Sequence, residues 1–171
     1  MYQDKLTLYK LIVLYMLSQV DFPLTTSQVS EFILDKGYAS YLSLQQSICE
    51  LIEANLVRAD TIRNRTLLYQ TNAGEEMLHF FGNKVSKAIK QDIYEYIQEN
   101  EIALKSEVSV SANYYESPNG DYEVKMIAKE KNGVLIDLVL SVPTKELAIS
   151  MCEKWDRDNQ KIYQYLMENL L

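Results

Sequence analysis

Histidine, cysteine and glycine, from which many enzyme and metal sites are built, are scarce in this sequence. Its 171 residues include one histidine, two cysteines and five glycines. The lone His79, without a cysteine pair, cannot supply a zinc ligand set, and glycines that stand singly form no phosphate-binding loop. No G-x-S-x-G elbow is present either. We therefore expect no enzyme activity, no metal and no cofactor.

Positive charge is scarce as well. Lysine and arginine number 17 against 24 aspartates and glutamates, which gives a formal net charge of -7. The basic excess that usually marks a nucleic-acid-binding protein is therefore missing from the chain as a whole. Cys49 and Cys152 stand far apart without a partner motif, which is typical of buried free thiols in a reducing compartment.

The sequence also lacks long apolar runs. The most apolar stretch lies within residues 1–20, but Lys10 interrupts it, it lacks a small-residue cleavage site, and it is too short to span a bilayer. Its apolar residues recur at helical spacing, so we expect a buried amphipathic helix and a cytoplasmic protein. The remaining composition, 47% apolar and 24% charged, is that of an ordinary soluble globular protein.

The first half of the chain contains clear signals for where helices begin and end. After a helix over roughly residues 4–19, Thr25 and Gln28 have the spacing of a capping box. This spacing predicts a second helix over residues 27–36. Gly37 is placed to end that helix in the left-handed conformation.

A third helix and a hairpin follow. Ser43 and Gln46 repeat the capping spacing and predict a helix over residues 44–55. Two β-rich runs, "LVRADTI" and "TLLYQT", flank the polar tip "RNR" and predict a hairpin, and "NAGEEMLHFF" predicts a fourth helix. Three helices followed by strand, loop and strand is the order of a winged helix-turn-helix. The sequence thus predicts a winged-helix DNA-binding domain over residues 1–82.

Five segments of the chain also carry a resemblance to a known family. They are "KLTLYKLIVLYML", "FPLTTSQVSEFIL", "YLSLQQSICEL", "RNRTLLYQTNAGEEML" and the "FF" that follows. Together they resemble a family of bacterial winged-helix proteins, domain-of-unknown-function family 4364, most densely over residues 5–82. The resemblance implies a winged-helix fold and a role in transcriptional regulation, and it implies no particular ligand or operator.

The second half, residues 83–171, predicts a separate domain. Apolar residues four apart indicate a connecting helix over residues 84–100. The period then switches to two, and turns at residues 118–120 and at Asn132–Gly133 predict a three-stranded antiparallel meander. Its last strand, "VLIDLVLSV", is nearly continuous in apolar residues, so we expect it to be the best covered strand. A long C-terminal helix follows Pro143.

The predicted fold is therefore α+β: an N-terminal winged helix-turn-helix, then a helix, a three-stranded antiparallel meander and a long C-terminal helix. The second domain, α-β-β-β-α, would serve dimerisation or effector binding. One winged helix has a small footprint, so we expect a homodimer on a palindromic site. The predicted dimer surface consists of Trp155, Ile162, Tyr163, Leu166 and Leu170. The alternative is that these side chains cover the sheet of their own chain. A small effector could bind between the halves, although no residue indicates one.

Arginine is rare, and its distribution is uneven. Three of the four arginines lie in the predicted hairpin. Arg63 and Arg65 flank Asn64 at the tip, where a guanidinium can bridge phosphates or enter a narrow minor groove. Arg58 lies at the base of the wing. We therefore predict that this wing contacts double-stranded DNA through these four residues.

The third helix supplies the other predicted DNA contacts. At about 100° per residue, Gln46 points away from the apolar face of that helix, and Gln45 flanks it. Glutamine can pair bidentately with adenine in the major groove. Tyr41 and Ser43 at the helix start, and Ser27 at the start of the second helix, could donate hydrogen bonds to phosphates.

Acidic residues favour a second interpretation. Glu50 and Glu53 are unfavourable near phosphates, and residues 1–82 hold six basic against nine acidic side chains, or -3. Screening beyond about 8–10 Å at physiological salt still permits an acidic protein to bind DNA. The leading interpretation is a DNA-binding transcriptional regulator. The alternative is a winged-helix adaptor that binds another protein through the same helix and wing.

Overall fold

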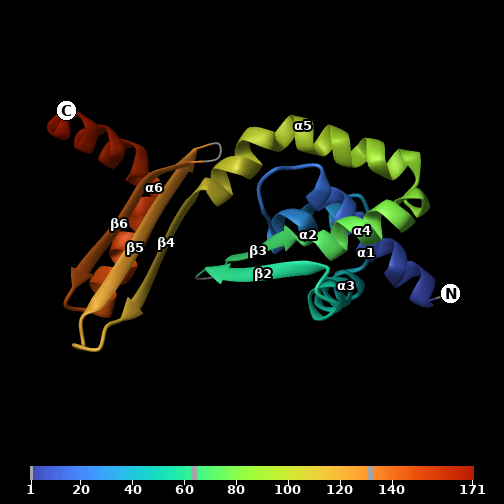
Figure 1. The fold of residues 1–171 in the computed structure, drawn as a ribbon, viewed down its shortest axis with the longest axis horizontal. Coiled ribbons are helices and arrows are strands. Elements are labelled where there is room, and N and C mark those ends of the chain that lie inside the picture. The colour runs from blue at the N-terminus through green and yellow to red at the C-terminus, as the bar shows by residue number, and fades with distance from the viewer. Residues whose placement is uncertain (1, 63–64, 131–132) are drawn as a thin grey trace. The chain divides into compact units, whose positions relative to one another are not determined.

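The computed structural model of the chain describes residues 2–62, 65–130 and 133–171. They form two compact units, Met1–Val108 (unit 1) and Ser109–Leu171 (unit 2), whose elements are labelled in Figure 1. The predicted division after Gly82 differs from this one. Helix α5 (Lys87–Ser109), predicted for the second domain, contributes Ile93 and other apolar side chains to the core of unit 1.

Unit 1 has a winged-helix-like arrangement, as predicted. Its elements are α1 (Tyr2–Ser18), β1 (Leu24–Thr25), α2 (Thr26–Asp35), α3 (Tyr41–Glu53), β2 (Val57–Ile62), β3 (Arg65–Gln70), α4 (Asn72–Phe81), the 3-10 turn η1 (Gly82–Lys84) and α5. Strand β3 is the middle strand and pairs antiparallel with both β1 and β2. Sequence analysis did not predict β1, because two residues are too few to show an alternating pattern.

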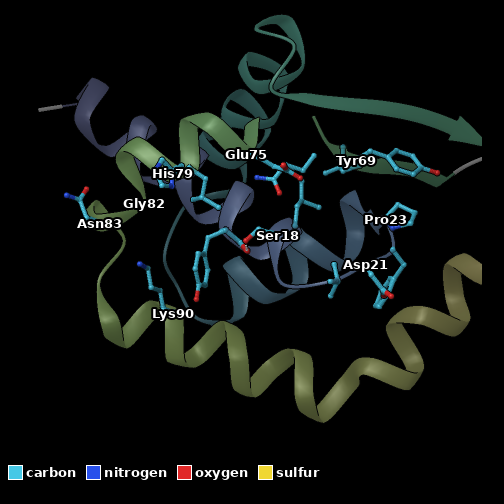
Figure 2. A pocket seen from close by; sticks show the side chains of 16 residues that line it. Ser18, Asp21, Pro23, Tyr69, Glu75, His79, Gly82, Asn83 and Lys90 are labelled. Carbon is cyan, nitrogen blue, oxygen red and sulfur yellow. Dashed lines mark hydrogen bonds between the residues drawn. The ribbon is translucent and has the colours of Figure 1, made fainter. Parts of the chain in front are cut away.

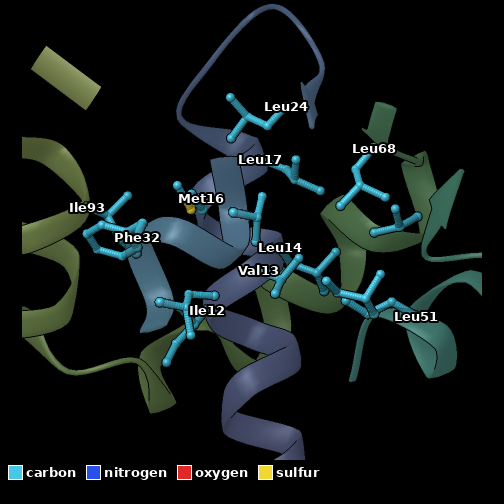
Figure 3. Packing of buried hydrophobic residues seen from close by; sticks show 14 of the residues in the cluster. Ile12, Val13, Leu14, Met16, Leu17, Leu24, Phe32, Leu51, Leu68 and Ile93 are labelled. Carbon is cyan, nitrogen blue, oxygen red and sulfur yellow. The ribbon is translucent and has the colours of Figure 1, made fainter. Parts of the chain in front are cut away.

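Helix α1 runs through the core of unit 1. Figure 3 shows Ile12, Val13, Leu14 and Met16 of α1 among apolar side chains of α2, α3, β3 and α5. These four side chains are at most 1% exposed. The middle of α1 is therefore buried on most sides, with Tyr15 partly exposed, so the predicted buried amphipathic helix is covered more fully than on one apolar face. Each fully buried aliphatic side chain of this kind contributes about 1.5–3 kcal/mol to folding.

Both ends of α2 match the prediction. Thr25 Oγ1 accepts a hydrogen bond from the backbone N–H of Gln28 at 3.0 Å, and the Gln28 carboxamide accepts one from the Thr25 N–H at 2.8 Å. Gly37, with φ of +67°, lies in the left-handed region just after the helix. Gln28 Nε2 also donates to the carbonyl of Leu104 on α5 at 3.3 Å, so one buried residue both caps α2 and links it to α5.

Helix α3 begins earlier than predicted, at Tyr41. Its N-cap is Ser40, whose Oγ accepts the backbone N–H of Ser43 at 3.3 Å. The predicted cap formed by Ser43 and Gln46 is therefore wrong, because both residues lie inside the helix. The early start places Tyr41 and its neighbours on the first turn of α3.

Unit 2 contains the meander and the long C-terminal helix that were predicted. Strands β4 (Val110–Glu116), β5 (Tyr122–Glu130) and β6 (Gly133–Val142) pair antiparallel in that order. Helix α6 (Lys145–Leu170) is capped by Thr144, whose side chain accepts the backbone N–H of Leu147 at 3.3 Å. One sheet face and α6 share a core built from Ala112, Val124, Met126, Ala128, Ile136, Ala148, Cys152 and Trp155.

The prediction that the last strand is the best covered is wrong. The central strand is β5, and β6 is an edge strand of this sheet. Helix α6 packs mainly on β4 and β5. The exposed apolar side chains of β6 are Val134, Leu135, Val139 and Leu140. A continuous apolar run predicts burial on both faces, but here it belongs to an edge strand that is only partly covered.

The predicted dimer residues of α6 differ in their exposure. Trp155 is only 1% exposed, and its indole N–H donates to a β5 carbonyl at 3.3 Å. Trp155 therefore lies in the core of unit 2 and not on the predicted dimer surface, because its side chain packs against the sheet. Ile162, Tyr163 and Leu166 are partly buried against the same core, and Leu170 is exposed.

Candidate nucleic-acid interface

The outward side of α3 is the centre of the candidate surface. The helix buries Leu44, Ile48 and Leu51 in the core of unit 1, so its opposite side faces solvent. Helical spacing places four exposed residues in one outward row, Leu42, Gln46, Cys49 and Glu53. Gln45 is partly buried beside this row. The row is that of a helix that could lie in a major groove.

An ion pair offsets negative charge beside this row. Lys10 Nζ on α1 lies 2.8 Å from Glu50 Oε2, and Gln46 Nε2 donates to Glu50 Oε1 at 2.9 Å. The hydrogen bond from Lys10, followed by that from Gln46, lowers the pKa of Glu50. Glu50 therefore carries its charge next to a matching cation, which reduces its repulsion of phosphate. Gln46 would have to release Glu50 in order to read a base.

The three predicted phosphate donors lie near helix N-termini. Tyr41 is the exposed first residue of α3, and Ser27 is exposed on the first turn of α2. Ser43 is partly buried, and its Oγ accepts a hydrogen bond from Ser40 Oγ at 2.9 Å. Backbone N–H groups at a helix N-terminus favour anions, so a phosphate would be stabilised at the first turns of α2 and α3 that carry these residues.

Arg58 is held within the wing by its neighbours. Its guanidinium carbon lies 4.3 Å from the ring centroid of Tyr69, which stands opposite on β3. Its Nη2 lies 3.2 Å from Asp60 Oδ2. Exposed pairs of this kind contribute at most about 1 kcal/mol, so Arg58 could exchange Asp60 for a phosphate. Asp60 nevertheless cancels part of the positive charge that the sequence placed at the base of the wing.

The wing tip carries the other predicted contacts. The β2–β3 ladder extends to the pair Ile62 and Arg65, and Arg65 is exposed. Opposite residues of an antiparallel ladder share a face, so Arg65 lies on the same face as Arg58. The predicted contacts Arg63 and Asn64 lie outside the described residues.

Sequence reasoning missed several residues that shape this surface. Asp60 stands two residues after Arg58 on one strand, so the shared face was a usable signal. The pairing of Lys10 with Glu50 had no local signal, because 40 residues separate them. The prediction of a buried thiol is wrong for Cys49, which is exposed on α3, whereas Cys152 is buried.

A pocket of about 770 Å³ lies elsewhere in unit 1 (Figure 2). Figure 2 shows Glu75 and His79 projecting from α4, Lys90 from α5 and Asp21 from the segment between α1 and β1. Lys90 Nζ lies 5.2 Å from the ring centroid of Tyr15. The described residues that line the pocket include none of the predicted DNA contacts, so the pocket is separate from the α3 surface.

The described part of the chain contains neither a group of metal ligands nor a membrane-spanning helix. Within residues 2–62, 65–130 and 133–171, no three histidine, cysteine or acidic side chains are grouped so that they could hold a metal ion. Across the same ranges, no helix has both the length and the apolar content that crossing a membrane requires.

A protein-family model matches the chain over residues 9–170, which takes in most of both units. The family is described as "Domain of unknown function (DUF4364)", a description that states no activity and no ligand. This match confirms the resemblance found in the sequence. No curated protein and no solved structure matches the chain.

Proposed function

Because the chain belongs to the DUF4364 family, whose description states no activity, we propose its function from the geometry of unit 1. We propose a DNA-binding transcriptional regulator of the winged-helix type that acts as a homodimer, with a binding function and no enzymatic one. The observation that carries the proposal is the outward row of α3, which belongs to the same compact unit as a hairpin with exposed Arg58 and Arg65.

The charge distribution near α3 supports this proposal. Glu50 is paired with Lys10, so this carboxylate beside the outward row is offset by a cation. Glu53 is exposed near the other end of the helix, away from the first turn. DNA affinity depends on the phosphates neutralised at the contact, and distant acidic charge is screened at physiological salt.

The wing arginines provide the direct test. Selection from random DNA should enrich a palindromic motif. Arg65→Ala and Arg63→Ala should each weaken binding to that motif by about three- to tenfold, or about 0.6–1.4 kcal/mol. Each should also reduce the slope of log affinity against log salt by about 1, because one phosphate contact is lost.

Arg157→Ala is the matched control for both variants. Arg157 Nη2 lies 2.9 Å from Asp158 in unit 2, so this change removes the same charge outside the wing. It should leave affinity and salt slope unchanged. If both wing variants bind DNA like the unaltered protein, the wing has no part in recognition.

One observation favours a protein-binding adaptor as the second candidate. Leu42 is 79% exposed and stands next to exposed Tyr41 on the first turn of α3. Exposed apolar side chains at helical positions suit a hydrophobic groove on another protein. Leu42→Ser would then abolish a complex of defined mass with a protein partner, and DNA selection would return no motif. A regulator would retain its motif in this variant, with only a local loss at a thymine methyl contact.

A further inference from the structure

We propose that β6 is the dimerisation strand of this protein. In this arrangement β6 of one copy pairs antiparallel with β6 of a second copy about a twofold axis. Two three-stranded meanders then form one six-stranded sheet. The inference rests on the homodimer of the proposed function and names the surface that forms it.

The backbone of β6 has capacity for a second partner. It pairs with β5 on one side, and none of the described strands pairs with it on the other. An antiparallel copy of the same strand supplies N–H and C=O groups at matching spacing. Soluble proteins usually protect such edges with lysine, proline or inward charges. Strand β6 contains neither lysine nor proline, and Asp137 is its one charged residue.

The sequence of β6 specifies how two copies would align. A register shift at Ala128/Lys129 of β5 leaves residues 136–142 as the regular part of β6. These residues read "IDLVLSV", which is nearly symmetric about Val139. Pairing centred on Val139 places Val139 opposite its own copy, and places Asp137 opposite Ser141 of the second copy.

The polar residues favour this register over its neighbours. The hydroxyl of Ser141 can donate to the Asp137 carboxylate of the second copy, twice per dimer. Pairing centred on Asp137 would instead place two carboxylates opposite each other, each offset only by Lys125 of its own β5 at 3.5 Å, which is less favourable. The other edge strand, β4, has polar Ser111 and Asn113 on its open face and no such symmetry.

The area that a stable dimer buries requires the end of α6 to contribute to the interface as well. A standard interface buries about 800 Å² per partner, more than seven paired residues cover by themselves. Figure 1 shows the last turns of α6 leaving the sheet on the side where β6 forms its edge. Tyr165 and Leu170 are exposed on these turns. They would extend the apolar surface on the α6 side of the sheet, where β6 exposes Leu140.

The mass of the 171-residue chain in solution tests the proposal without DNA. The chain is 19.8 kDa, so analytical ultracentrifugation should give the dimer a mass of twice 19.8, or 39.6 kDa. Val139→Lys places two ammonium groups opposite each other and should raise the dimer dissociation constant at least about tenfold. Val139 is 51% exposed but stands opposite Lys125 on β5, so the folding of this variant is checked by circular dichroism. Asn113→Lys adds the same charge at an exposed site on β4 and should leave the dimer unchanged.

Disulfide trapping tests the register. In a Cys49→Ser background, Val139→Cys should form a covalent dimer on mild oxidation, because directly opposite residues lie within disulfide range. Val134→Cys is the control, since Val134 is more exposed, at 57%, but lies far from its own copy in this register. Selective trapping at Val139 supports the proposal. Equal trapping at both positions, or none, overturns it.

The outcomes for β6 and for DNA binding are separable. A protein that is monomeric at its highest soluble concentration, or a Val139→Lys dimer as tight as the unaltered one, overturns the β6 interface whatever the DNA result. A dimer that responds as expected but selects no DNA motif overturns the regulator and leaves the interface standing.

Discussion

Among single residues, Glu50 shows how an acidic side chain can occupy a surface proposed to face phosphates. Its carboxylate accepts hydrogen bonds from Lys10 on α1 and from Gln46 one turn earlier on α3. These bonds lower its pKa, so its charge persists to lower pH than that of an isolated glutamate. The same pair links the central helix of the core to the proposed recognition helix.

The pH dependence of stability should report this pair. The pKa of Glu50 is lower in the folded than in the unfolded protein, so its stabilising effect is present above about pH 4.5, the ordinary glutamate pKa. It is lost as the pH falls through the lowered folded-state pKa. As the pH is lowered through this range, we expect the urea midpoint of unfolding to fall less steeply in Glu50→Gln than in the unaltered protein.

Glu53→Gln is the control for this measurement, because Glu53 is an exposed glutamate on the same helix. It should leave the pH profile close to that of the unaltered protein. An unchanged profile in Glu50→Gln would show that the ion pair with Lys10 does not persist in solution.

Among the elements, α4 is packed unusually close to the root of the wing. A Cβ at Gly74 would lie only 2.2 Å from the carbonyl oxygen of Leu56. The same oxygen accepts hydrogen bonds from the backbone N–H of Thr71 at 3.2 Å and from its hydroxyl at 3.0 Å. Thr71 also caps α4. The start of α4 and the residue before β2 are thus held together where no side chain fits between them.

Gly74→Ala should therefore destabilise unit 1 by about 1–3 kcal/mol, because the backbone would have to move apart. Alanine is the better helix former, so propensity alone predicts the opposite sign. Gly82→Ala is the control, since its Cβ would meet its nearest neighbour at an ordinary 3.4 Å. Urea unfolding followed by circular dichroism measures both. A stabilised Gly74→Ala protein would contradict the close packing.

For the chain as a whole, the cores that the described residues form in the two units have no residue in common. The single tryptophan, Trp155, lies in the core of unit 2. Its fluorescence should therefore follow the unfolding of unit 2, whereas circular dichroism also follows the helices of unit 1. In Gly74→Ala we expect the dichroism transition to move to lower urea while the fluorescence midpoint stays in place. Equal shifts in both signals would show that the units unfold together.

The features that could be predicted from the sequence depend on neighbours along the chain. The cap of α2 at Thr25 and Gln28 and its end at Gly37 were predicted because a helix end is specified within a few residues. The meander was predicted because turns and a period of two are local patterns. The order of these elements was sufficient to predict the winged-helix-like arrangement. Their residues were sufficient to identify the family.

The features that could not be predicted depend on contacts between distant segments or on competition between nearby ones. Ser40 displaced Ser43 as the cap of α3 because both stand within one turn of the helix start. Lys10 meets Glu50, and α5 joins the core of unit 1, only when the chain is folded. The exposure of β6 follows from its position at the edge of the sheet, which its own apolar pattern does not encode. A periodic pattern identifies an element, but its neighbours in space set which side chains are covered and which remain free to bind.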